Sequence, residues 1–200
     1  DALSYALAGY VTASVNYRLT ANNDVNAATR TLAIEQASDD VMNAIRYLKA
    51  NAATFHIDTS RVAVIGTSAG GALALVDAIE PDTLDNTLSD YPGQSAAVDA
   101  VVSTGATLVD PLFDSGALLT YDRDDAPVLM FHAKPQDGTT GATWDGNVVP
   151  TQTDIKNSGN SCTAVATANG GHTVSLALGG NYWNNYVQAF LWQKLRLSGL

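Results

Sequence analysis

Short apolar runs rich in valine alternate with segments of helical periodicity along this chain of 200 residues. Continuous apolar runs of this length are typical of strands that are buried on both faces of a parallel sheet. Strands that alternate with helices form βα units, so the pattern predicts an α/β fold with a mostly parallel sheet. We expect strands at residues 10–17, 61–65, 98–102, 127–131 and 163–167.

Helical segments separate these runs. The segment 34–51 carries its apolar residues on one face at helical spacing. An alanine-rich helix is expected at residues 69–79, where it ends before Pro81. Residues 1–8 are consistent with the end of a first helix, and a last helix begins near Asn181 with an aromatic stripe that we interpret as core packing.

Composition limits the classes of partner. The formal net charge is −10, so the surface repels nucleic-acid phosphates and anionic lipids, and we exclude both. No apolar run is long enough to span a membrane, and we expect one domain over residues 1–200. The scarcity of Lys and Arg favours an exported protein, although no signal peptide is visible. Cys162 is the only cysteine and is expected to pack as a small hydrophobic residue.

The most informative motif is Gly66-Thr-Ser-Ala-Gly70, which fits the pattern G-x-S-x-G. It lies between an expected strand and an expected helix, which is the context that gives the pattern meaning. Such a turn exposes the serine hydroxyl at the end of a strand, and we expect glycine at 66 and 70 to keep side chains out of it. Ser68 is therefore the candidate nucleophile, and the N–H of Ala69 is a candidate oxyanion donor.

A serine hydroxyl needs a base to accept its proton. His172 lies in a glycine-containing loop after the last expected strand, from which an imidazole can reach the strand ends, and it is the candidate base. His56 precedes the strand that leads to Ser68 and is interpreted as a loop residue. His132 ends the strand at 127–131 and is interpreted as a structural residue near the site.

An acid should orient this imidazole and stabilise its charge. It should follow the strand at 127–131, in the long segment 133–151 that we expect to be a loop. Two aspartates compete there, Asp137 and Asp145, and each precedes a glycine as turn residues often do. The residues themselves leave this choice open.

The sequence resembles the esterase/lipase branch of the α/β-hydrolases, which includes secreted acetyl and feruloyl esterases. Four segments carry the resemblance. Residues 9–19 resemble the strand that ends in D/N-Y-R-L, and residues 57–71 resemble the segment that leads into the nucleophile. Residues 100–106 resemble the strand and turn that follow it, and Phe131-His-Ala133 resembles the His-Gly that precedes the acid. In that family Val-Pro closely follows the acid. Because Val148 and Pro150 follow Asp145, the resemblance favours Asp145, with Asp137 as the alternative.

Three departures from the family qualify this resemblance. Extra residues, among them Trp144, separate His132 from Asp145. The glycine-rich loop that supplies a second oxyanion donor is missing, and so are the first strands of the sheet. Between Gly105 and Pro127 there is no room for a large helical cap, which implies an open site. The resemblance predicts a carboxylic ester hydrolase that needs no cofactor or metal and acts on small-molecule or glycan-linked esters. The alternatives are a peptidase or amidase of the same fold, or a non-catalytic or truncated relative.

Overall fold

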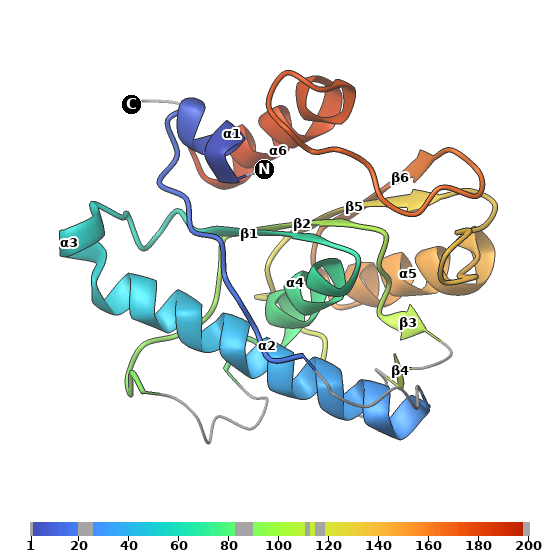
Figure 1. Cartoon of the computed structure of the whole chain (residues 1–200), viewed down its shortest axis with the longest axis horizontal. Helices are drawn as coiled ribbons and strands as arrows, with labels where there is room; N and C mark the ends of the chain where they lie inside the picture. Colours follow the sequence, from blue (N-terminus) through green and yellow to red (C-terminus); the bar gives the residue numbers. More distant parts are fainter. Residues whose placement is uncertain (1, 20–25, 83–89, 111–112, 115–118, 198–200) are drawn as a thin grey trace.

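Four parallel strands form the centre of the structure, a computed structural model that describes residues 2–19, 26–82, 90–110, 113–114 and 119–197 (Figure 1). In sheet order these strands are β1 (Ala63–Thr67), β2 (Ala100–Thr104), β5 (Val128–Ala133) and β6 (Cys162–Thr167). Every neighbouring pair is parallel. The predicted α/β fold is confirmed, and four of the expected strands are present within two residues of their expected bounds.

Helices cover both faces of this sheet (Figure 1). On one face lie α2 (Ala27–Ala50), α4 (Ala69–Ile79) and α5 (Val149–Asn157). On the other lie α1 (Ala2–Leu7) and a C-terminal helix made of the π-helical segment η3 (Trp183–Val187) and α6 (Gln188–Lys194). The short helix α3 (Ala52–Phe55) follows α2.

The two central strands separate two hydrophobic cores. Val101 and Met130 pack with α2 and α4, whereas Val102 and Leu129 pack on the opposite face with Trp183 of the C-terminal helix. Every residue of β2 and β5 is buried. This burial on both faces is the reason that these strands appear in the sequence as continuous apolar runs.

The helix α2 begins earlier than the apolar periodicity indicates, at Ala27 instead of near residue 34. A capping box fixes its start: the Asn26 side chain accepts a hydrogen bond from the Thr29 N–H, and the Thr29 hydroxyl oxygen accepts one from the Asn26 N–H, both at 3.1 Å. The first turns of α2 are stabilised by this cap and precede the buried residues Ala37, Val41 and Met42. A search for an apolar face therefore misses them.

The prediction of a strand at residues 10–17 is wrong. This segment has no strand assignment in the part of the chain that the structure describes, and Val11 is 60% exposed. Its two ends are held locally, by the Tyr10 N–H donating to the Tyr5 carbonyl at 3.2 Å and by Arg18 pairing with Asp40 at 2.8 Å. An apolar pattern shows that a segment can be extended, but a strand also needs a neighbour for its backbone hydrogen bonds.

Between β2 and β5 the described residues hold one short hairpin, formed by β3 (Val109–Asp110) and β4 (Phe113–Asp114). None of the described residues between 105 and 127 is helical. The segment that would carry a cap in many lipases is therefore a small antiparallel hairpin here, as far as the structure describes it.

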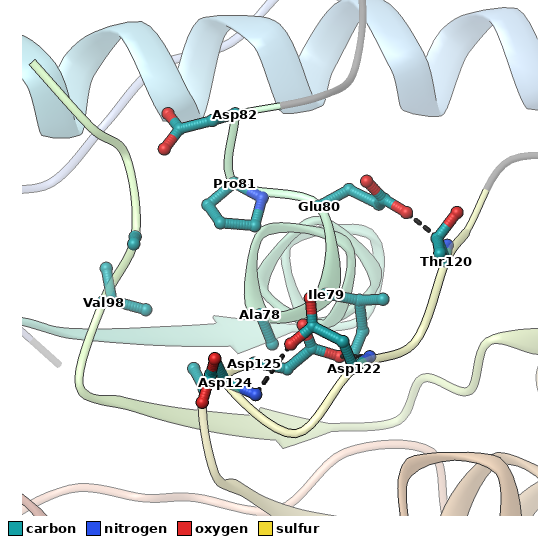
Figure 2. Close-up of a pocket in the computed structure, with 12 residues that line it drawn as sticks. Ala78, Ile79, Glu80, Pro81, Asp82, Val98, Thr120, Asp122, Asp124 and Asp125 are labelled. Carbon is teal, nitrogen blue, oxygen red and sulfur yellow. Dashed lines mark hydrogen bonds between the residues drawn. The ribbon is translucent and has the colours of Figure 1, made fainter. Parts of the chain in front are cut away.

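A hollow of about 360 Å³ lies near the edge at which β2 and β5 begin, and Figure 2 shows the residues that line it. It is lined by the C-terminal end of α4, and by residues that precede the two strands. Its polar lining is acidic, with Glu80, Asp82, Asp122, Asp124 and Asp125. Burial raises the pKa of Asp125 to about 7, and the nearby carboxylates of Asp122 and Glu80 add to the effect, against a hydrogen bond from the Asp122 amide.

This raised pKa predicts a dependence of stability on pH. The folded chain keeps the Asp125 proton between the ordinary pKa of 3.8 and about 7, where the unfolded chain has lost it. Stability from this group is therefore present at low pH and falls as the pH rises through that window. We expect Asp125→Asn to flatten this decline in urea unfolding measured from pH 4 to pH 8. Asp124→Asn is the matched control, because the Asp124 side chain is 93% exposed. An Asp125→Asn variant with the wild-type pH profile would contradict the prediction.

Candidate active site

Ser68 occupies the turn between the end of β1 and the start of α4. Its backbone has φ 55° and ψ −120°, a conformation that is strained for any residue other than glycine. The turn is held to the neighbouring strand because the Ser68 N–H donates to the Thr104 carbonyl at 2.9 Å. Backbone strain of this kind is typical of a serine that a strand-to-helix turn presents at the sheet edge.

Gly66 is the residue that makes this turn possible. A Cβ at position 66 would lie 1.9 Å from the carbonyl oxygen of Gly70, so no other residue fits without moving the backbone. Gly70 differs, because a Cβ added there meets nothing within 4 Å. The motif predicts that both glycines keep side chains out of the turn, but of the two only Gly66 lies where a Cβ would meet another atom.

His172 lies in the segment that follows β6 and contacts two other side chains. Its Nε2 is 2.7 Å from Ser68 Oγ, and its Nδ1 is 2.8 Å from Asp137 Oδ2. A carboxylate can only accept, so Nδ1 carries the hydrogen and Nε2 accepts the hydrogen bond that the serine hydroxyl donates. The chain of hydrogen bonds thus runs from the serine through the imidazole to the carboxylate.

Asp137 is fully buried and uses both of its carboxylate oxygens. Oδ1 accepts hydrogen bonds from the amides of Thr139 and Thr140 at 2.8 and 2.9 Å, and Oδ2 accepts from His172. Burial by itself would raise the pKa of Asp137, but these hydrogen bonds outweigh it and hold the pKa below its ordinary value. Asp137 therefore stays ionised beside the imidazole near neutral pH.

The structure brings Asp137 to His172, and it does not bring Asp145, which the resemblance favoured. Asp145 is exposed in the π-helical segment η2 (Trp144–Val148). A tight turn follows Asp137, closed by a bridge between Gln136 and Thr143. The extra residues of this segment therefore lie after the aspartate that contacts His172. For this reason Val148 and Pro150 follow that aspartate at a longer distance along the chain than the resemblance implies.

The expectation of a long loop at residues 133–151 is wrong, because regular elements occupy much of this segment. The segment contains the bridged turn, η2 and the first residues of α5, with Pro150 in the first turn of that helix. Proline is tolerated there because the first helical N–H groups have no partner within the helix.

Backbone contacts hold the loop after β5 against the loop after β6. The Gly170 N–H donates to the Gln136 carbonyl at 2.9 Å, and a Cβ on Gly138 would lie 2.4 Å from the Gly170 oxygen. Gly105 has φ 72°, and a Cβ there would lie 2.7 Å from the His172 carbonyl oxygen. These glycines allow the loops that carry Asp137 and His172 to approach each other, a packing role that the sequence patterns do not predict.

Thr104 connects the turn at Ser68 (the nucleophile turn, named for its candidate nucleophile) to the segment around His172 (the histidine loop). Its carbonyl accepts from Ser68, as described, and its hydroxyl oxygen accepts from the Val174 N–H at 3.0 Å. It is buried at the end of β2, between the two segments. Sequence reasoning missed Thr104 because a threonine at the end of a strand is common.

The remaining candidates have clear places. Ala69 is exposed in the first turn of α4, where the N–H groups have no helical acceptor. His56 ends α3 in the left-handed conformation, and it is exposed. Cys162 is buried in β6, and burial raises the pKa of its thiol to about 12. Among the described residues, no group of three or more His, Cys, Asp or Glu is arranged to hold a metal ion.

We expect alanine substitutions at the two glycines of the motif to have different effects on the free energy of unfolding. Gly66→Ala forces a side chain into the Gly70 carbonyl, and overpacking of this kind typically costs about 1–3 kcal/mol. Gly70→Ala places a methyl group in open space within a helix, where alanine is favoured over glycine by up to about 1 kcal/mol. We expect urea unfolding to show a clear loss for Gly66→Ala and no loss for Gly70→Ala. Equal losses in both variants would contradict this assignment.

The fold is shared with solved structures. Esterase 2 of Thermogutta terrifontis phosphonylated by cyclosarin matches with TM-score 0.63 and 21% identity, over 88% of this chain and 65% of that one. The same organism's esterase with propionate bound matches with TM-score 0.64 and 19% identity, over 91% and 68%. MGS-M1, an alpha/beta hydrolase enzyme from a Medee basin deep-sea metagenome library, matches with TM-score 0.65 and 19% identity, over 98% and 76%.

These comparisons also set the relative length of the chain, which spans about two thirds of the length of the Thermogutta terrifontis structures. No match was found among curated proteins. Of the helices that the structure describes, none combines the length and the apolar character that a membrane crossing requires.

Residues 2–111, more than half of the chain, match the model of the BD-FAE family. The chain therefore belongs to the BD-FAE family of esterase-like hydrolases with the α/β-hydrolase fold.

Proposed function

We propose that this chain hydrolyses carboxylic esters through an acyl-enzyme on Ser68, with His172 as base and Asp137 as the acid that orients it. The observation that carries the proposal is the hydrogen-bonded chain from Ser68 Oγ to His172 Nε2 at 2.7 Å and from His172 Nδ1 to Asp137 at 2.8 Å. It lies at the carboxyl ends of the parallel strands, which is where open α/β sheets bind their ligands.

In the first step the Ser68 oxygen attacks the ester carbonyl carbon while His172 Nε2 accepts the hydroxyl proton. The carbonyl oxygen becomes an oxyanion beside the start of α4, and the Ala69 N–H is the donor that we propose for it. The same imidazole then gives its proton to the alkoxide oxygen of the leaving alcohol, and the acyl group remains on Ser68.

In the second step water replaces the alcohol. His172 accepts a proton from the water, whose oxygen attacks the acyl carbon. When the bond between that carbon and the Ser68 oxygen breaks, the imidazolium returns the proton to this oxygen, and the carboxylic acid and the free Ser68 hydroxyl result. Asp137 keeps the hydrogen on Nδ1, so that Nε2 always faces the reacting oxygen, and stabilises the imidazolium formed in each step. The depressed pKa of Asp137 supports this role because the carboxylate stays charged.

Short acyl groups and accessible esters are the substrates that we favour. The described residues between β2 and β5 form a hairpin and no helix, so they do not build a deep acyl tunnel over Ser68. Solved structures of the Thermogutta terrifontis esterase are described with propionate and with butyrate bound, which supports short acyl chains for this fold. Esters linked to carbohydrate are compatible with the same open edge.

Hydrolysis of p-nitrophenyl acetate and butyrate tests the proposal directly. Wild-type protein should release p-nitrophenol, and Ser68→Ala should reduce kcat by about 10⁴-fold or more, because nothing else supplies the nucleophile. A fluorophosphonate probe should label wild-type protein and leave Ser68→Ala unlabelled. A folded wild-type protein that neither turns over ester nor takes the label would refute the esterase proposal and favour a non-catalytic relative.

The choice of acid gives a separate test. Asp137→Asn keeps the shape of the site but favours the wrong imidazole tautomer, a change that lowers kcat by about 10⁴-fold in a triad enzyme. Asp145→Asn is the matched control, and because Asp145 is exposed in η2 we expect its kcat to stay close to wild type. A larger loss for Asp145→Asn than for Asp137→Asn would overturn the assignment.

A further inference from the structure

His132 lies behind the carboxylate that His172 uses. It is the fifth residue of β5, and its side chain is 1% exposed. Its Nε2 is 3.7 Å from Asp137 Oδ2, the same oxygen that accepts the hydrogen bond from His172 Nδ1. Two imidazoles therefore face one carboxylate oxygen, one from the segment after β6 and one from the strand that leads to Asp137.

Both ring nitrogens of His132 face oxygen acceptors. Nδ1 is 3.2 Å from the carbonyl oxygen of Ala133, and Nε2 faces Asp137. A neutral imidazole has one N–H, so one of the two nitrogens faces its oxygen with a lone pair. A lone pair is less favourable beside the charged carboxylate of Asp137 than beside the neutral carbonyl of Ala133, which favours the hydrogen on Nε2 and makes the contact with Asp137 attractive. The 3.7 Å separation is longer than a hydrogen bond, but it is short enough for electrostatic attraction in a site closed to water.

The two carboxylate oxygens of Asp137 are held by different elements. Oδ1 is held by the amides of Thr139 and Thr140, whereas Oδ2 has His172 as its hydrogen-bond donor. His172 lies in an irregular segment after β6, so a contact from a strand adds a fixed support at Oδ2. His132 stands on a strand buried at every residue, which gives it a fixed position.

We infer that His132 is a positioning residue, which holds the Asp137 carboxylate so that Oδ2 faces His172 Nδ1. This inference rests on the proposed hydrolase function, because it assigns the His132 side chain a role in orienting the base. His132 does not touch Ser68 or the reacting atoms, and it acts through Asp137. From the sequence alone His132 is interpreted as a structural residue near the site, and the contact with Asp137 gives that position a part in the reaction.

Three substitutions separate positioning from packing. The amide nitrogen of glutamine lies near the place of Nε2, whereas that of asparagine lies near the place of Nδ1, and leucine supplies neither. We expect His132→Gln to keep kcat within about twofold of wild type. We expect His132→Asn and His132→Leu to lower kcat by about 10-fold or more with KM little changed, because small displacements of a catalytic group cost up to about 10²-fold.

His56→Asn is the matched control, because His56 is exposed and adopts a left-handed conformation that asparagine tolerates. This variant should behave as wild type. A His132→Leu variant with wild-type kcat would overturn the inference. It would also be overturned if glutamine, asparagine and leucine all lost kcat in proportion to their loss of thermal stability, because packing alone would then explain the effect.

A readout independent of turnover distinguishes failure of this inference from failure of the proposed function. The proton on His172 Nδ1 should give a low-field NMR resonance that is absent from His172→Ala. In His132→Leu this resonance should move upfield or broaden, while His56→Asn leaves it unchanged. If wild-type protein hydrolyses no ester, the proposed function fails and the resonance alone decides the inference. An unchanged resonance in His132→Leu would refute it.

Discussion

The site depends on the parallel alignment of β1, β2, β5 and β6. Parallel strands end at one edge of the sheet, so segments far apart in the sequence leave the sheet close together in space. Ser68 follows β1, Asp137 follows β5 and His172 follows β6. The backbone bond from the Ser68 N–H to Thr104 ties the nucleophile turn to β2, and the Thr104 hydroxyl ties β2 to the histidine loop. The geometry of the three side chains is thus a consequence of strand register.

Close approach of backbones is the second requirement. Gly66, Gly105 and Gly138 each stand where a Cβ would lie less than 3 Å from a neighbouring backbone oxygen. Asp137 can stay charged while buried because two amides and His172 supply its hydrogen bonds. The acidic hollow of Figure 2 lies near the opposite ends of the strands and has no contact with these three side chains. The three hydrogen-bonded side chains and the acidic hollow therefore lie at opposite ends of the parallel strands.

Local patterns predicted much of this structure. The strand-turn-helix around Ser68 follows from an apolar run, the G-x-S-x-G motif and an alanine-rich segment, each of which is a property of neighbouring residues. The strands β2 and β5 could be found because burial on both faces leaves a continuous apolar run. The segment 10–17 is also rich in residues that favour strands, but it forms no strand in the described structure, because pairing depends on a partner that local pattern does not specify.

The sequence by itself determined the α/β fold class and the strand-turn-helix at Ser68, because periodicity and motif spacing encode short-range structure. It indicated His172 only through the place of this residue after the last expected strand. Only the tertiary structure showed that Asp137, and not Asp145, contacts His172, and only it placed His132 behind the carboxylate. The bridge between Gln136 and Thr143 brings the first aspartate back to the sheet edge and turns the second one out to solvent. Such a choice depends on hydrogen bonds between loops that are more than thirty residues apart in the chain, and no local pattern records them.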